Sequence, residues 1–186
     1  MPKLNKINCW LGKQYKLDCS DNYDAYMKEL GMGLVQRKLG NTQKPIVMLH
    51  QVGSTHNLLT INDDKPPHIL TFKLGKEFEE ETYDLRKMCT VMNLYDNTLV
   101  QEQKGVACTK VVITREFHLT KMIEQSVINN VAAVRVFRVI DEDERKDLNE
   151  VLQKLEKEQR PKDGENDKKK GAHEVNVVQL VDNLNI

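Results

Sequence analysis

The segment Val111–Phe117, Val-Val-Ile-Thr-Arg-Glu-Phe, contains one arginine among apolar residues. Alternate side chains of an extended strand share a face, so Arg115 shares a face with Ile113 and Phe117. A guanidinium on such a face carries a desolvation cost unless an anion pairs with it. The spacing therefore predicts a binding site for a carboxylate; an arginine at a strand end that reaches solvent is the alternative.

The side chains that bind metals or act as nucleophiles are scattered along the chain. The five histidines show no H-x-x-x-H spacing, and the four cysteines show no C-x-x-C spacing. No serine lies in a G-x-S-x-G turn, and no set of acid, base and nucleophile can be named. We therefore expect free thiols, no metal, no cofactor and no enzymatic activity.

Charge and hydropathy exclude two further classes of protein. The 28 lysines and arginines balance 28 aspartates and glutamates, so no net charge would hold the chain on a nucleic acid or an anionic membrane. No apolar run approaches the ~20 residues that span a bilayer, and the N-terminal residues lack the apolar region of a signal peptide. We expect a soluble, cytosolic protein without a nucleic-acid partner.

Between Pro45 and Ile140, short runs rich in β-branched residues alternate with turn-forming residues about every eight to twelve positions. Antiparallel strands in such number favour closure, because closure removes exposed strand edges. The sequence therefore predicts an all-β, ten-stranded, up-and-down barrel. The predicted strands are residues 13–19, 46–52, 57–62, 68–74, 79–83, 88–94, 98–103, 108–117, 121–127 and 131–140.

Residues 22–42 form the one helical stretch expected before Ile140. Two short amphipathic pieces are separated by Gly31-Met32-Gly33, which predicts a helix-turn-helix. Ser20 or Asp21 is the expected N-cap of the first piece.

After Ile140 the composition changes abruptly to charged residues. Acidic residues at the start, followed by apolar residues at helical spacing, predict a helix over about 141–159. A disordered linker over 160–172 and a short apolar segment over 173–186 should follow; the latter fits a helix or a strand equally well. The predicted organisation is a barrel domain, 1–140, and a charged extension, 141–186.

A spaced motif runs through Lys13–Leu30. Lys13 is followed by Tyr15 and Leu17, then by Asn22-Tyr23-Asp24, Tyr26-Met27 and Leu30. This motif resembles the N-terminal signature of the cytosolic fatty-acid-binding protein family, the intracellular lipid-binding proteins of the calycin superfamily. The resemblance covers about residues 8–139 and includes Arg37–Asn41, Phe72–Gly75 and Glu77–Glu80 in the family's order.

The resemblance implies a clamshell barrel with the helix-turn-helix as a lid and a lipid inside. Proteins of this family hold the ligand carboxylate with two arginines and a tyrosine, and the matching positions are Arg115, Arg135 and Phe137. Pattern alone leaves the orientation of Arg135 open, because residues 131–140 are apolar on both faces. Phe137 lacks a hydroxyl, so we expect carboxylate binding to be weaker by ~0.5–1.5 kcal/mol.

The same resemblance gives the remaining site residues. Lys65 and Tyr83 are expected at the portal through which the ligand enters. The residues expected to line the cavity are Tyr23, Met27, Met48, Phe72, Ile113 and Phe117.

The expected function is intracellular transport of a long-chain fatty acid or related lipid by a monomer in the cytoplasm, and also in the nucleus. For the basic residues of the lid helices, the sequence favours a solvated helix face, and transient membrane contact is the alternative. Two alternatives remain open at this stage. The ligand could be a retinoid, a bile acid or an acyl-CoA, or the barrel could lack a ligand and bind a protein through its extension.

Overall fold

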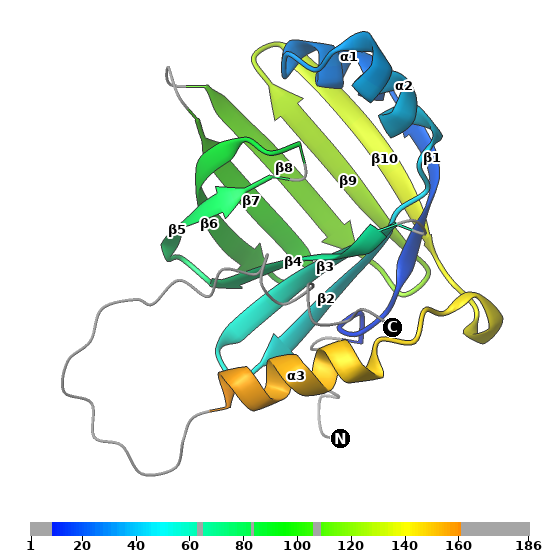
Figure 1. Ribbon diagram of the computed structural model, residues 1–186, viewed down its shortest axis with the longest axis vertical. Coiled ribbons are helices and arrows are strands. Elements are labelled where there is room, and N and C mark those ends of the chain that lie inside the picture. The colour runs from blue at the N-terminus through cyan, green and yellow to red at the C-terminus, as the bar shows by residue number, and fades with distance from the viewer. Residues whose placement is uncertain (1–8, 63–64, 83, 106–108, 161–186) are drawn as a thin grey trace, which may run out of the picture. The chain divides into compact units, whose positions relative to one another are not determined.

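The computed structural model describes residues 9–62, 65–82, 84–105 and 109–160. Their strands form one antiparallel sheet, and two helices follow the first strand (Figure 1). The strands are β1 (Tyr15–Asp21), β2 (Ile46–Val52), β3 (Thr55–Asn62), β4 (Lys65–Lys73), β5 (Glu77–Glu81), β6 (Lys87–Tyr95), β7 (Thr98–Lys104), β8 (Lys110–Phe117), β9 (Lys121–Ile128) and β10 (Val131–Val139). The helices are α1 (Tyr23–Glu29), α2 (Leu34–Thr42) and α3 (Asn149–Gln159), with a 3-10 turn η2 (Glu142–Glu144).

The sheet has ten strands in the order β4-β3-β2-β1-β10-β9-β8-β7-β6-β5. Each strand pairs with its neighbour in the chain except across the β4–β5 junction, and β1 pairs with β10. The predicted all-β, up-and-down barrel is confirmed.

Side chains bridge the seam between β4 and β5, the two outer strands of the sheet. Phe72 of β4 stacks on Phe78 of β5 with ring centroids 6.2 Å apart. His68 Nε2 lies 3.3 Å from the carbonyl oxygen of Glu81. The seam is therefore held by side-chain contacts where the rest of the barrel is held by backbone pairing.

The interior contains two clusters of buried apolar side chains. The smaller cluster lies beside α1 and includes Met27, Val111 and Ile128. The larger cluster includes Tyr15, Phe117 and Phe137, and these three side chains are almost fully buried. Such burial of alternate strand residues follows from the period of two in a pleated sheet.

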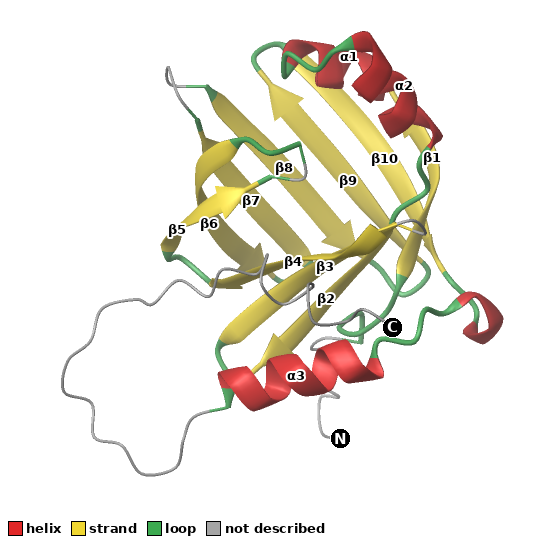
Figure 2. Ribbon diagram, viewed as in Figure 1, coloured by secondary structure: helices red, strands yellow, loops and turns green. Residues whose placement is uncertain are grey.

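The helix-turn-helix covers one end of the barrel (Figure 2). The predicted N-cap is wrong: β1 continues through Asp21, and Asn22, with φ of 57°, caps α1. Asparagine tolerates this left-handed conformation better than most residues, and the Asn22 side chain donates a 2.7 Å hydrogen bond to the carbonyl of Ala132 on β10. Helix α2 exposes an apolar surface formed by Leu34, Val35 and Leu39.

The prediction of one helix over 141–159 is wrong at its start, because the helix begins at Asn149. The side chain of Gln14 donates to the Lys146 carbonyl at 2.8 Å and accepts from the Lys146 amide at 3.0 Å. Glu144 pairs with Lys16 and Arg138. Apart from the 3-10 turn η2, these contacts with the barrel take the place of α-helical hydrogen bonds in the segment before Asn149.

Contacts divide the chain into two compact units, residues 1–147 and 148–186. Helix α3 belongs to the second unit. The predicted linker, apart from Arg160, and the predicted segment 173–186 lie outside the described residues. Among the described residues, no helix combines the length and apolar character needed to cross a bilayer.

Candidate functional site

Inside the barrel, polar side chains lie between the two apolar clusters. Along β8 the inward positions run from Val111 through Arg115 to Phe117, and the two apolar residues belong to different clusters. Strands β9 and β10 likewise have inward residues of one cluster at each end, with Glu124 and Arg135 between them. Strand alternation thus brings charged groups of three neighbouring strands to one level. We call this set the polar layer: Glu80, Thr90, Gln101, Gln103, Arg115, Glu124 and Arg135.

Arg115 lies in the interior, as the spacing predicted, with 8% of its surface exposed. Its Nε donates to Glu124 Oε2 at 2.8 Å, and its Nη1 donates to Gln101 Oε1 at 2.8 Å. Arg115 and Glu124 are directly opposite each other in the β8–β9 register, where cross-strand side chains of one face meet. The guanidinium is therefore already paired with an anion of the protein itself.

Arg135 also faces the interior, which decides the orientation that the pattern of β10 left open. Its Nη1 lies 3.4 Å from Glu124 Oε1. Its Cζ lies 4.4 Å from the Tyr23 ring centroid and 5.1 Å from that of Phe137, within the range of cation–π attraction. Nε is buried and has no hydrogen-bond partner among the described residues. Arg135 thus keeps one donor for another group.

Glu124 was missed by the sequence analysis, which considered only cations. Its carboxylate lies between Arg115 and Arg135 and is 5% exposed as a residue. The available signal was alternation along β9, which puts Glu124 on the face of the buried Met122 and Ile128. An acidic residue on the buried face of the strand next to Arg115 indicates a cross-strand ion pair.

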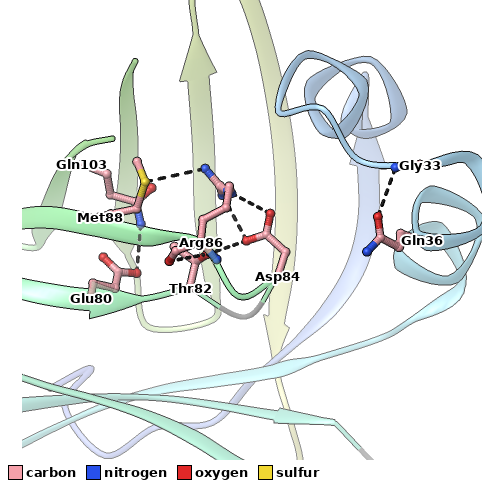
Figure 3. Close-up of polar contacts among 8 residues, drawn as sticks. All are labelled: Gly33, Gln36, Glu80, Thr82, Asp84, Arg86, Met88 and Gln103. Carbon is pink, nitrogen blue, oxygen red and sulfur yellow. Dashed lines mark hydrogen bonds and ion pairs between the residues drawn. The ribbon is translucent and has the colours of Figure 1, made fainter. Parts of the chain in front are cut away.

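A second carboxylate in the polar layer is surrounded by neutral donors. Glu80 accepts hydrogen bonds from Thr90 Oγ1 at 2.6 Å and from Gln101 Nε2 at 2.8 Å. It also accepts one from Gln103 Nε2 at 2.9 Å (Figure 3). Since Gln101 also binds Arg115, the hydrogen bonds run continuously from β5 to β10. Gln103 Oε1 is buried without a partner among the described residues.

Residues 12–151 match the model of the lipocalin / cytosolic fatty-acid binding protein family. The chain belongs to this family. Among curated relatives, fatty acid-binding protein 5 of Pygoscelis papua is 38% identical, over 71% of this chain and 97% of its own. The fatty acid-binding protein of Tyrophagus putrescentiae is 40% identical, over 69% of this chain and 96% of its own.

Solved structures of fatty-acid-binding proteins show the same fold. The crystal structure from brain tissue of Drosophila melanogaster is 45% identical, with a TM-score of 0.66 over 70% of this chain and 99% of its own. The Schistosoma mansoni protein, solved in complex with arachidonic acid, is 32% identical, with a TM-score of 0.66 over 71% of this chain and 96% of its own. The similarity thus lies in the barrel.

Five of the six residues that the family resemblance assigned to the lining lie in or against the interior clusters. Met27, Phe72 and Phe117 are buried in them, and Tyr23 and Ile113 pack against the smaller one. Met48 is the exception.

Met48 lies on the opposite face of β2 from Val47 and Leu49, which belong to the larger cluster. The assignment of Met48 to the interior is therefore wrong. Ile46–Leu49 is apolar at every position, so alternation could not decide which face points inward.

The region expected to form the family's portal is polar. Lys65 is exposed at the start of β4, and Tyr83 lies outside the described residues. Between β5 and β6, Arg86 Nε donates to Asp84 Oδ2 at 2.7 Å, and Thr82 Oγ1 donates to Asp84 Oδ1 (Figure 3). Burial acts to raise the pKa of Asp84, but the hydrogen bonds from Arg86 and Thr82 outweigh it and lower that pKa.

Tyr23 links the lid to the polar layer, because it lies on α1 and its ring stacks against the guanidinium of Arg135. Burial raises the pKa of the Tyr23 hydroxyl, while the charge of Arg135 acts in the opposite direction. The phenol therefore stays neutral at physiological pH.

Proposed function

We propose that this protein binds a long-chain fatty acid non-covalently inside its barrel and carries it through the cytoplasm. The observation that carries the proposal is the pair of interior arginines, because Arg135 keeps a buried Nε donor without a partner among the described residues. Membership of the family and the names of its curated relatives support the same function.

The apolar clusters and the polar layer have different parts in this proposal. Burial of each methylene of a lipid chain is worth ~0.8 kcal/mol, so the apolar side chains supply most of the affinity. A hydrogen bond to a charged group adds ~1.5–3 kcal/mol and fixes which end of the ligand meets Arg135. Phe137 supplies a ring but no hydroxyl beside that arginine, so the head group has one donor fewer than the family pattern provides.

In this proposal the ligand enters at the lid helices and the strands beside them. The exposed Leu34, Val35 and Leu39 of α2 suit a transient contact with a membrane surface. Of the two residues proposed for the portal, Lys65 is the one that the structure describes, and it lies at the start of β4. Carriage by a monomer needs no covalent step, so no catalytic residue is assigned.

Displacement of the uncharged fluorescent probe N-phenyl-1-naphthylamine tests the proposal. Palmitate should displace the probe from the native protein. Arg135→Gln should weaken palmitate binding by about tenfold, the loss expected for one charge-assisted hydrogen bond. Arg138→Gln is the matched control, because Arg138 is exposed on the same strand, and it should leave binding unchanged. Failure of palmitate to displace a bound probe would contradict the proposal.

A further inference from the structure

Glu124 takes the position that a ligand carboxylate would need. One of its oxygens accepts from Arg115 Nε at 2.8 Å, and the other lies 3.4 Å from Arg135 Nη1. Both arginine side chains are nearly buried, at 10% and 11% exposure, and the Glu124 side chain is 7% exposed. A fatty-acid anion would therefore meet guanidinium groups that already have a carboxylate between them.

The charges of the polar layer are balanced before any ligand arrives. It contains two guanidiniums and two carboxylates: Glu124 contacts both arginines, and Gln101 links Glu80 to Arg115. A ligand carboxylate would be a third anion in a poorly solvated space, where charge repulsion is much stronger than in water. Since both arginines contact Glu124, their attraction for a further anion is reduced.

The hydrogen-bonding groups left over suit a hydroxyl head group at least as well as a carboxylate. Within the polar layer, Arg135 Nε is a buried donor without a partner among the described residues, and Gln103 Oε1 is a buried acceptor in the same condition. A carboxylate can satisfy only a donor, because it has no hydrogen to give. A hydroxyl can satisfy either group, because it both donates and accepts.

We propose that Glu124 is a specificity-determining residue that competes with the ligand carboxylate for Arg115 and Arg135. The native interior then holds a lipid mainly by its chain and accepts a long-chain alcohol as readily as the corresponding fatty-acid anion. This inference rests on the proposed lipid carriage and narrows it to a class of head groups.

Competition of dodecanoate and 1-dodecanol against N-phenyl-1-naphthylamine at pH 7.4 tests the inference. In the native protein, the dissociation constants of the two lipids should agree within about threefold. Glu124→Gln keeps the size and an acceptor oxygen but removes the charge. It should tighten dodecanoate binding by about tenfold or more, equivalent to 1.4 kcal/mol, and leave dodecanol within about twofold.

Glu116→Gln is the matched control. It removes the same charge from the adjacent β8, where Glu116 is half exposed and pairs with His118. Neither lipid should bind differently to this variant.

The outcomes separate the inference from the proposed function. An unchanged dodecanoate affinity in Glu124→Gln, with lipid still bound, overturns the inference and leaves lipid carriage standing. If the native protein binds dodecanoate more than about tenfold tighter than dodecanol, the inference is overturned. This measurement needs no variant, so it remains decisive if Glu124→Gln fails to fold. Displacement by neither lipid from the native protein overturns the proposed function, and the inference with it.

Discussion

The two faces of β10 each contribute an arginine to a group in which one glutamate contacts two cations. Inside the barrel, Glu124 lies between Arg115 and Arg135. Outside it, Glu144 lies between Arg138, at 2.7 Å, and Lys16, at 3.4 Å. The inner glutamate side chain is 7% exposed and the outer one 36%.

The same arrangement of charges therefore has different consequences on the two faces. Outside, water screens the charges, and such pairs add little stability. Inside, removal of one partner leaves the others without compensation in a poorly solvated space. The comparison predicts that equivalent substitutions have unequal effects on the two faces.

Glu124→Ala should have the largest effect on the free energy of unfolding. It leaves the buried guanidiniums of Arg115 and Arg135 without their anion, a loss of about 3–5 kcal/mol. Urea denaturation at pH 7 measures it, and Glu144→Ala is the matched substitution outside the barrel. Equal destabilisation by the two alanine variants would refute the distinction between the faces.

Gln14→Ala should remove both hydrogen bonds that attach the Lys146 backbone to the barrel. The expected loss of unfolding free energy is about 1–3 kcal/mol, at ~0.5–1.5 kcal/mol per bond. Trypsin cleavage after Arg145 or Lys146 should also become faster than in the native protein. Gln125→Ala, an exposed position of β9, is the control, and a cleavage rate unaffected by Gln14→Ala would count against this attachment.

Phe137→Tyr should add a hydroxyl donor to the inner group, because the Phe137 ring lies beside Arg135. Dodecanoate binding should tighten by ~0.5–1.5 kcal/mol, about two- to tenfold. Probe displacement measures this change, and circular dichroism verifies that the fully buried position tolerates the added oxygen. Unchanged affinity in a folded variant would place the head group away from Phe137.

Glu144→Gln should have the smallest effect, and its effect should depend on pH. Hydrogen bonds from Arg138 and then Lys16 lower the pKa of Glu144 from 4.5 to about 2. A lowered folded-state pKa stabilises the protein above pH 4.5, and this contribution is lost as the pH falls toward 2. Glu144→Gln should thus melt slightly below the native protein at pH 7, and the difference should shrink at pH 2. A difference that persists at pH 2 would contradict this.

The barrel was predictable from the sequence because its strands have strong local signals. Ile46–Val52 has the same bounds in the prediction and the structure, since Pro45 and Gly53 limit it on both sides. The interior position of Arg115 could be predicted because it shares a face with Val111 and Phe117, which are both buried. By contrast, Met48 was misplaced because it lies within an unbroken apolar run, where alternation of apolar and polar residues cannot show which face points inward.

Most of the polar layer could not be predicted in the same way, although alternation along β9 places Glu124 on the buried face. Gln101, Gln103 and Glu124 are polar residues at inward positions, and alternation normally assigns such residues to the solvent face. Cross-strand pairing, a long-range property, sets Glu124 opposite Arg115. Gln101 and Gln103 lie opposite Ile113 and Val111, and their acceptor is Glu80 of β5, which the register does not reveal. The late start of α3 has a similar origin, because the partners of Glu144 and Lys146 lie on strands distant in sequence.

The polar layer also fixes how β8 aligns with its neighbour. A slip of two residues keeps every inward side chain inward, so burial of apolar surface alone opposes it weakly. Such a slip would set Arg115 opposite Met122 or Ser126 in place of Glu124, and both buried charges would lose their partner. The ion pair thus excludes a misaligned hairpin that hydrophobicity would tolerate.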